Sequence, residues 1–244
     1  MQTHRSFLED IIDESVELLP MAPVDFDALL SKGWRLLGYS LIRHNFAICR
    51  GRICRTIPLR IRLDDQPFFS KSQRQLLRRN AGLDVRCAPI VITPEKEALF
   101  NRHTRRFSDR QPLSVYSFLH PEANDTPVPG LEFSIYEQSK LIACSYVHLG
   151  ANAVSATYCF FDPDIAQRSL GSFTMLLELE LAQRLGKQYY YHGYCYDVPS
   201  QFDYKLNFNH LEAMDWKSGA WAPRPRMPVR PWQGLAQESG DPHG

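Results

Sequence analysis

One stretch of the chain, residues 153–186, constrains the fold most strongly because its residue types specify a strand, a loop and a helix in that order. A β-branched and aromatic run at 154–161 predicts a strand, and an Asp-Pro-Asp turn follows at 162–164. Polar residues and then regularly spaced apolar residues predict an amphipathic helix over 169–185, which Gly186 ends. The sequence therefore predicts an α+β fold around a strand-loop-helix unit.

The start of this predicted helix is a candidate anion site. Arg168, Ser169 and Gly171 precede or begin the first turn, where amide groups have no acceptor within the helix and the positive end of the helix dipole lies. A glycine at such a place more often serves backbone geometry alone. Other evidence is needed to favour binding.

Three linked segments of the second half resemble one protein family. They are FFDPDIAQRSLGSF at 160–173, QYYYHGYCY at 188–196, and YKLNF with HLEAM at 204–214. In this order they are similar to the C-terminal domain of the arginyl/leucyl-tRNA-protein transferases. The resemblance covers roughly residues 131–216. It implies a GNAT-like core, a mixed and mostly antiparallel sheet with flanking helices.

The first half is basic and the second half acidic. Residues 50–110 contain fifteen Lys or Arg against six Asp or Glu, whereas residues 111–215 contain five against twelve. This asymmetry suits a protein with one polyanionic partner and one cationic ligand. Chance segregation of charge on solvated faces is the alternative.

A short basic helix is predicted at 71–79, opened by a Ser70/Gln73 capping box and ended near Asn80. It resembles a basic motif of the same transferases. The resemblance implies contacts to the phosphates of tRNA, which are salt-dependent and independent of base sequence. The expected tRNA-binding residues are this helix's cations and one arginine of the strand predicted at 57–63: Arg60, Lys71, Arg74, Arg78 and Arg79.

The resemblance also implies a substrate site around the predicted helix start. There the amides and side chains would face the terminal nucleotide and the amino acid that it carries. Phe173 stands where the coenzyme A-binding relatives have a small residue, which argues against that cofactor. The expected substrate-binding residues are Arg168, Ser169, Gly171, Phe173, Tyr158, Tyr191, Tyr194 and His192, although an aromatic core is an equal alternative for the tyrosines and a buried core position is favoured for His192.

The implied reaction moves an amino acid, arginine or leucine, from charged tRNA to an amine, most simply a protein N-terminus. Asp162 is expected to be catalytic or to bind a cation of the donor, and Lys205 to meet the developing oxyanion or a phosphate. A turn-capping role is the alternative for the aspartates, favoured for Asp164. No cofactor is expected beyond the aminoacyl-tRNA itself, and no metal site is assigned.

Other functions remain open. They are tRNA-dependent aminoacylation of a small molecule or peptide, coenzyme A-dependent N-acyl transfer on the same fold, and RNA binding without catalysis. The segments predicted are a basic docking region at 1–120, a proline-rich hinge at 121–130, a catalytic core at 131–218 and a tail at 219–244.

Further expectations concern the N-terminus, the thiols and the cell compartment. Two short helices are predicted within residues 1–31. Six scattered cysteines predict reduced thiols, and two of them, Cys49 and Cys54, stand where the family has a cysteine cluster. With no long apolar segment or signal peptide, we expect no membrane partner and a cytoplasmic protein.

Overall fold

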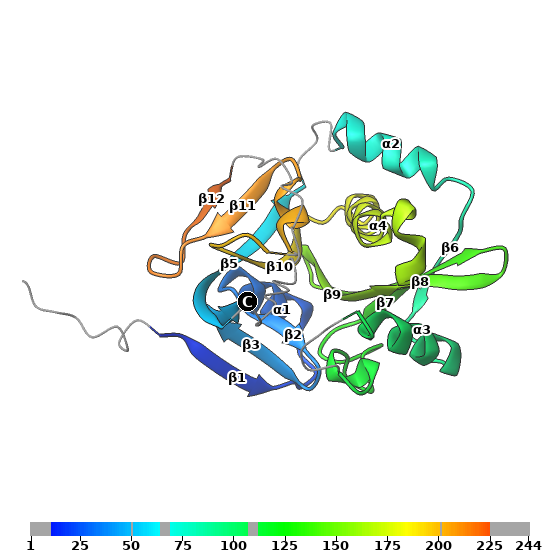
Figure 1. Cartoon of the computed structure of the whole chain (residues 1–244). Coiled ribbons are helices and arrows are strands. Elements are labelled where there is room, and N and C mark those ends of the chain that lie inside the picture. Colours follow the sequence, from blue (N-terminus) through cyan, green and yellow to red (C-terminus); the bar gives the residue numbers. More distant parts are fainter. Residues whose placement is uncertain (1–10, 50, 64–68, 107–111, 201, 225–244) are drawn as a thin grey trace, which may run out of the picture.

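The computed structural model describes residues 11–49, 51–63, 69–106, 112–200 and 202–224, most of which are built around one nine-stranded sheet (Figure 1). Neighbouring strands are antiparallel, except that β9 and β10 are parallel over Ala153–Ser155 and Tyr189–Tyr191. The strands lie in the order β12 (Trp221–Pro223), β11 (Leu211–Met214), β5 (Arg52–Arg62), β10 (Tyr189–Tyr196), β9 (Ala153–Phe161), β8 (Lys140–Leu149), β7 (Gly130–Glu137) and β6 (Asp84–Pro89), with β4 (Phe46–Cys49) paired to the start of β5. This mixed, mostly antiparallel sheet confirms the predicted fold class.

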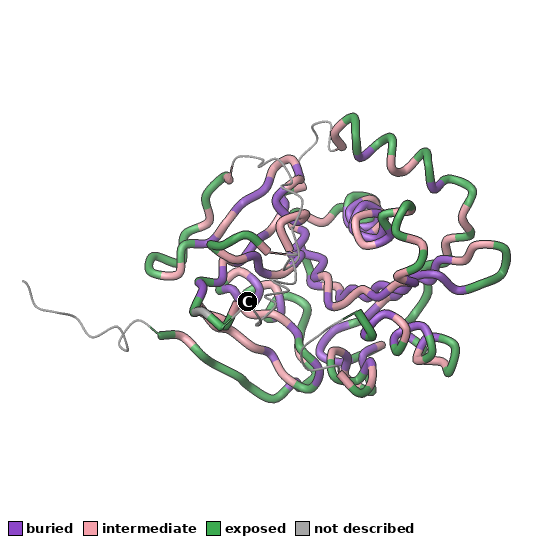
Figure 2. The backbone as a smooth tube through the Cα atoms, in the orientation of Figure 1, coloured by how far each residue is buried: buried purple, intermediate pink, exposed green. Residues whose placement is uncertain are grey.

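Helices cover both faces of the strands β7 to β9. Helix α4 (Leu170–Arg184) and helix α2 (Lys71–Arg79) lie on one side, and α3 (Pro94–Thr104) lies on the other (Figure 1). The residues of α4 are mostly buried while those of α2 are mostly exposed (Figure 2). Helix α4 is therefore the central helix of the core. The short 3-10 helix η3 (Pro163–Arg168) precedes it, η4 (Asp203–Leu206) follows β10, and Val115 of η2 (Val115–Ser117) packs with Leu99 and Phe100 of α3.

The predicted strand-loop-helix-strand order is confirmed as β9, η3, α4 and β10. Helix α4 begins after Ser169 and ends at Arg184, and Gly186, just beyond the C-cap residue Leu185, has a φ of 65°, which glycine readily adopts. The amides of Gly186 and Lys187 bond to the carbonyls of Gln183 and Ala182, which completes a Schellman motif. The turn predicted between β7 and β8 is also present.

A smaller sheet stands beside the main one. It contains β1 (Asp13–Glu17), β3 (Ser40–His44) and β2 (Arg35–Leu37) in that order, with α1 (Pro23–Ser31) next to it. Helix α1 was predicted, whereas 13–17 form a strand instead of the first predicted helix. Pairing of β1 with β3 overrides the helical spacing of the local sequence; residues 1–10 lie outside the described part.

Strands of the predicted docking region lie inside the same sheet as the predicted core. Strand β5 pairs with β10 and β11, and β6 pairs with β7. The proline-rich segment 121–130 therefore does not coincide with a break in the sheet. Of the predicted tail, β12 pairs with β11, and 225–244 are outside the described residues.

The cysteines differ from expectation at one pair. Cys49 and Cys54 form a disulfide across the β4–β5 hairpin, so the expectation of reduced thiols is wrong there. The hairpin register places the pair close together, which sequence spacing alone did not indicate. Free thiols remain at Cys87, Cys144, Cys159 and Cys195.

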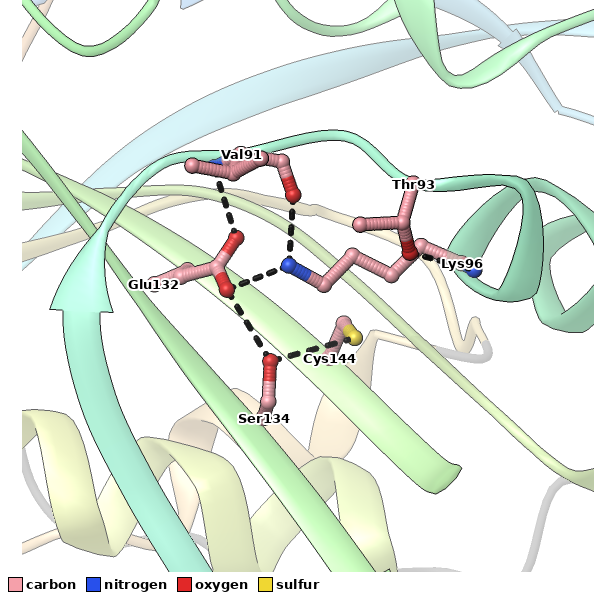
Figure 3. Close-up of polar contacts among 6 residues, drawn as sticks. All are labelled: Val91, Thr93, Lys96, Glu132, Ser134 and Cys144. Carbon is pink, nitrogen blue, oxygen red and sulfur yellow. Dashed lines mark hydrogen bonds and ion pairs between the residues drawn. The ribbon is translucent and has the colours of Figure 1, made fainter. Parts of the chain in front are cut away.

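A buried ion pair joins α3 to the sheet. Lys96 of α3 is paired with Glu132 of β7, and both side chains are buried (Figure 3). The Lys96 Nζ also donates to the Val91 carbonyl at 2.5 Å, while the Val91 amide and the Ser134 hydroxyl donate to Glu132 at 3.1 Å each. We call Val91, Lys96, Glu132 and Ser134 the closed cluster, because the two charged side chains, Lys96 and Glu132, bond to each other and to the other two members.

Candidate active site

A cavity of about 810 Å³ opens where β9 and β10 separate. These strands are hydrogen-bonded only as far as Ser155 and Tyr191, and beyond that point their side chains line a space that α4, η4, β2, β3 and α3 enclose. The cavity is a consequence of the diverging parallel strands, and it has the size typical of ligand sites.

The N-terminal turn of α4 forms one wall. Ser169 has a φ of 50° and is followed by Leu170, Gly171 and Ser172, which all line the cavity. The first three amides of a helix have no acceptor within it. A Cβ on Gly171 would lie 3.2 Å from the Phe161 ring, so glycine permits this close packing. The structure thus brings Ser169 and Gly171 to the cavity, as the sequence predicts.

Arg168 has a different position from the one expected. Its guanidinium is paired with Glu137 and donates to the Arg79 carbonyl at 3.1 Å, and its side chain does not line the cavity. In return, Asn80 donates to the Arg168 carbonyl at 3.0 Å, and Arg79 to the Ser169 hydroxyl at 3.2 Å. Arg168 therefore fixes α2 to the start of α4.

Asp162 is buried away from the cavity. One carboxylate oxygen accepts from the Asp164 amide at 3.1 Å, and the other pairs with Lys140 at 2.8 Å. Burial raises the pKa of Asp162, but the bonds from Lys140 and the Asp164 amide outweigh it and leave the pKa below its usual value. The prediction of a catalytic Asp162 is wrong in position: it caps η3, the role that had been favoured for Asp164.

The aromatic residues expected in the site are divided by the structure. Tyr158, His192 and Tyr194 line the cavity, together with Tyr190 and Tyr196. A bulge lies at His192, since Tyr191 pairs with Arg60 and Gly193 with Leu59, so simple alternation along β10 does not hold.

Two predicted substrate contacts lie elsewhere. Tyr191 packs in another core cluster and accepts a hydrogen bond from Arg60 at 3.2 Å. The Phe173 side chain is buried with Ile135, Ile142 and Leu170. Phe173 therefore does not narrow the cavity, and the argument from its size against coenzyme A is wrong.

His192 is a buried histidine whose ring lies near the backbones of Tyr190 and Lys205. It is 3% exposed, and neither ring nitrogen meets the geometry of a hydrogen bond with any described residue. Its ring is stacked on Tyr190. Burial and the charge of Lys205 lower the pKa of His192 to about 3, so the ring is neutral at physiological pH.

Lys205 and Glu178 are two buried residues of opposite charge in the cavity, which Arg35 and Arg106 also line. The Lys205 Nζ donates to the Tyr194 carbonyl at 3.3 Å, and burial and the charge of Arg35 lower the Lys205 pKa to about 7. The Tyr190 hydroxyl donates to Glu178 at 2.5 Å. Burial raises the pKa of Glu178 to about 7 despite this bond.

Sequence reasoning missed Glu178. The sequence feature that could have identified it is its spacing: Glu178 lies four residues after Thr174 and three before Leu181, on the face of the helix that is buried. His103 was also assigned no chemistry, yet it is buried and lines the cavity. The Arg106 guanidinium donates to its Nε2 at 2.9 Å, and its Nδ1 lies 3.0 Å from both the amide and the carbonyl of Phe161.

The predicted tRNA-binding cations also separate into two groups. Lys71, Arg74, Arg78 and Arg79 of α2 are exposed. Arg60, by contrast, is paired with Glu212 at 2.7 Å, with its Cζ 4.0 Å from the Tyr189 ring centroid. The Arg60 guanidinium is thus occupied within the fold, contrary to the expected phosphate contact.

The described part of the chain groups no three His, Cys, Asp or Glu side chains that could hold a metal ion. None of the helices in the same ranges is long and apolar enough to cross a membrane.

The cavity combines features that acyl transfer requires. It has helix-terminal amides and a lysine, which can stabilise negative charge, and a carboxylate whose pKa is near neutrality, which can exchange a proton. These groups suit an amine attacking an activated ester.

Comparison with known proteins gives the family. Residues 95–215 match the family model "Arginine-tRNA-protein transferase, C terminus". The aspartate/glutamate leucyltransferase of Chromohalobacter salexigens is 35% identical over 196 residues, which cover 78% of this chain and 76% of the relative. That of Stenotrophomonas maltophilia is 32% identical over 197 residues, 76% of this chain and 75% of the relative.

A partial structural likeness was also found to the GCN5-related glucosamine N-acetyltransferase region of a fungal multi-domain β-N-acetylglucosaminidase. The TM-score is 0.43 at 14% identity, covering 78% of this chain and 21% of that one. The sequence matches decide the family: the chain belongs to the arginyl/leucyl-tRNA-protein transferases and is an aminoacyltransferase.

Proposed function

We propose that this enzyme transfers leucine from charged tRNA to proteins that begin with aspartate or glutamate. The observation that carries this proposal is the positive charge of the cavity. Three cationic residues line it, Arg35, Arg106 and Lys205, whereas its described wall contains a single carboxylate. An acidic N-terminal side chain is attracted to such a site. The names of the similar leucyltransferases agree with this choice.

The donor amino acid is proposed to be leucine because the cavity suits a neutral side chain. Its wall includes Leu37, Ile42, Phe118 and Met175. An arginine side chain would need a carboxylate partner when desolvated, and Glu178 already accepts a bond from Tyr190. Apolar side chains in the cavity stabilise leucine by burial of its surface.

The deciding experiment is a transfer assay with tRNA charged with labelled leucine or arginine and with peptides that begin with Asp, Glu, Arg or Lys. We expect label on the Asp and Glu peptides from leucyl-tRNA alone. Transfer of arginine would overturn the donor. Consumption of leucyl-tRNA with label on a small amine instead of a peptide would overturn the acceptor.

A matched pair of variants tests the acceptor charge. Arg106→Gln removes a cavity cation and is expected to raise KM for the Asp peptide about tenfold, the effect of one charge-assisted contact of about 1.4 kcal/mol. The neighbouring Arg105 is exposed and does not line the cavity, so Arg105→Gln is the control. Equal KM values for both variants would contradict the assignment.

We propose that α2 docks the tRNA backbone next to the cavity. The exposed cations of α2 are held at the start of α4 by the Arg79 and Asn80 contacts. If the tRNA backbone binds along α2, the 3′ end of the tRNA lies toward the N-terminal amides of α4 and Lys205. We assign these amides and Lys205 to binding the ester oxygen. No part of this proposal requires a cofactor.

Salt dependence tests the docking helix. Arg74→Ala with Arg78→Ala removes two phosphate contacts, so the slope of log K against log salt is expected to fall by about 1.5–2. Lys32→Ala with Lys217→Ala removes equal charge at exposed positions outside α2. A slope unchanged by the α2 substitutions would exclude this helix from the tRNA site.

A further inference from the structure

We infer that Glu178 is a catalytic residue, the carboxylate that binds the acceptor's α-ammonium in the cavity and removes its proton. This inference rests on the proposed transfer to an amine. It adds the group that prepares the nucleophile, which the proposed function leaves unassigned.

The position of Glu178 is the first observation. It lies in the middle of α4, is 2% exposed, and lines the cavity of about 810 Å³. Burial of a carboxylate without a paired cation is costly, and proteins retain such groups most often at functional sites. Its hydrogen-bonding partner is the neutral Tyr190 hydroxyl, not a cation.

The charge around Glu178 is the second observation. The other charged residues of the cavity wall are Arg35, Arg106 and Lys205, in so far as the wall is described. They attract an acidic side chain but repel the α-ammonium that must react. Within that wall Glu178 alone offers the ammonium an opposite charge.

The groups packed around Glu178 keep its proton exchangeable. They are Tyr190 of β10, Ser145 of β8 and Lys205 of η4, while Cys159 and Tyr204 also face it. Their balance with burial gives the pKa of about 7, so both the carboxylate and the acid are populated at neutral pH. A general base is most effective under this condition.

Other cavity residues are less suited to this step. His192 has a pKa of about 3 and accepts a proton poorly. Lys205 has a pKa of about 7, the same as Glu178, but its charged form repels the ammonium and its neutral form offers no charge to attract it. It therefore cannot both hold and deprotonate the nucleophile as a carboxylate can. The division of roles between an anion and a cation therefore favours Glu178 as the base.

The proposed step balances in atoms and charge. The α-ammonium gives one proton to the Glu178 carboxylate, and the neutral amine attacks the ester carbonyl carbon of the aminoacyl-tRNA. A C–N bond forms and a tetrahedral oxyanion results. The C–O bond to the ribose then breaks, the second amine proton goes to the ribose oxygen, and Glu178 returns its proton to solvent.

The test compares Glu178→Gln with Glu180→Gln across pH. Glutamine keeps an oxygen for the Tyr190 hydrogen bond but cannot take a proton. We expect kcat with the Asp peptide to fall about 100-fold at pH 7, the typical contribution of a general base, with charged tRNA still bound. Because the free α-amine has a pKa of about 8, the loss should shrink toward pH 9. Glu180 lies outside the cavity wall and should have no such effect.

Two outcomes would overturn the inference: an unchanged kcat in Glu178→Gln, or a loss of the same size at pH 7 and pH 9. If the wild type transfers no label to any peptide, the proposed function itself fails, which is a different result from an active wild type with an unaffected variant.

Tyr190→Phe gives a second test should Glu178→Gln not fold. Tyr190 is a positioning residue whose hydrogen bond lowers the Glu178 pKa. Its removal is expected to shift the lower limb of the pH profile of kcat to higher pH. A profile that does not move contradicts the assignment.

Discussion

The closed cluster around Lys96 and the cavity group around Glu178 both bury charge, but they differ in how their polar atoms are satisfied. In the closed cluster an ammonium and a carboxylate meet, and further bonds from Val91 and Ser134 complete them. In the cavity, Glu178 and Lys205 have neutral partners, and His192 has no hydrogen bond to a described residue. The first arrangement satisfies its charged atoms within the fold, while the second leaves the ring nitrogens of His192 without such a bond.

The largest effect is expected from opening the closed cluster. Lys96→Met leaves Glu132 buried without its cation, so the free energy of unfolding should fall by about 3–5 kcal/mol. Denaturant titration measures this loss. The kcat per folded molecule is expected to stay unchanged. A loss of free energy of unfolding under about 1 kcal/mol would contradict the role of Lys96 and Glu132 as a structural pair.

The same substitution in the cavity should have the opposite profile. Lys205→Met is expected to lower kcat about 10²–10³-fold, as for loss of one group that stabilises an oxyanion. Its free energy of unfolding should change by less than about 1 kcal/mol, because a buried ammonium beside Arg35 is replaced by an apolar side chain. Strong destabilisation with normal kcat would remove the contrast between the two clusters.

A smaller effect is expected in the pH dependence of stability. Because the folded-state pKa of Glu178 is raised from 4.5 to about 7, the folded protein binds the extra proton in this range. Its contribution to stability is present below pH 4.5 and is lost as pH rises through 7. Relative to the wild type, Glu178→Gln should therefore gain up to about 1.4 kcal/mol per pH unit over this window. Denaturant titrations at pH 5 and pH 7 measure this gain. If the difference in free energy of unfolding between Glu178→Gln and the wild type is the same at both pH values, the prediction is contradicted.

The smallest effect is expected at His192. His192→Phe removes two buried ring nitrogens that meet no hydrogen-bond geometry with a described residue, and it keeps a ring against Tyr190, so stability should rise by about 1 kcal/mol. The corresponding change in the closed cluster, Ser134→Ala, should lower stability by about 1 kcal/mol because Glu132 loses a donor. Thermal unfolding of both variants tests this difference. Stability changes of the same sign in His192→Phe and Ser134→Ala would contradict the contrast between the two clusters.

Local patterns predicted much of the fold. The Ser70/Gln73 capping box, the Asp-Pro-Asp turn and the Gly186 helix end each have a local physical cause and are present. These local features depend on a few neighbouring residues. Ser169, Gly171, Tyr158, Tyr194, His192 and Lys205 all line the cavity, and their grouping was indicated by the family resemblance and not by any local pattern.

Features set by distant parts of the chain were not predicted. The partners of Arg60, Arg168 and Asp162 come from residues remote in sequence, so these apparently available charges turned out to be occupied. The separation of Tyr191 from the cavity depends on a bulge against β5. Glu178 was missed because a single acidic residue in an amphipathic helix is ordinary until its depth is known.

The place of β5 between β10 and β11 bears on how the enzyme is made. During synthesis β5 leaves the ribosome long before β10 and β11. Most of its backbone hydrogen bonds can therefore form only after the last third of the chain has been made. A fragment that lacked β5 would expose β10 as a bare edge open to intermolecular pairing. The wall of the cavity includes residues of β10 and η4, so the cavity is complete only after the last third of the chain has been made.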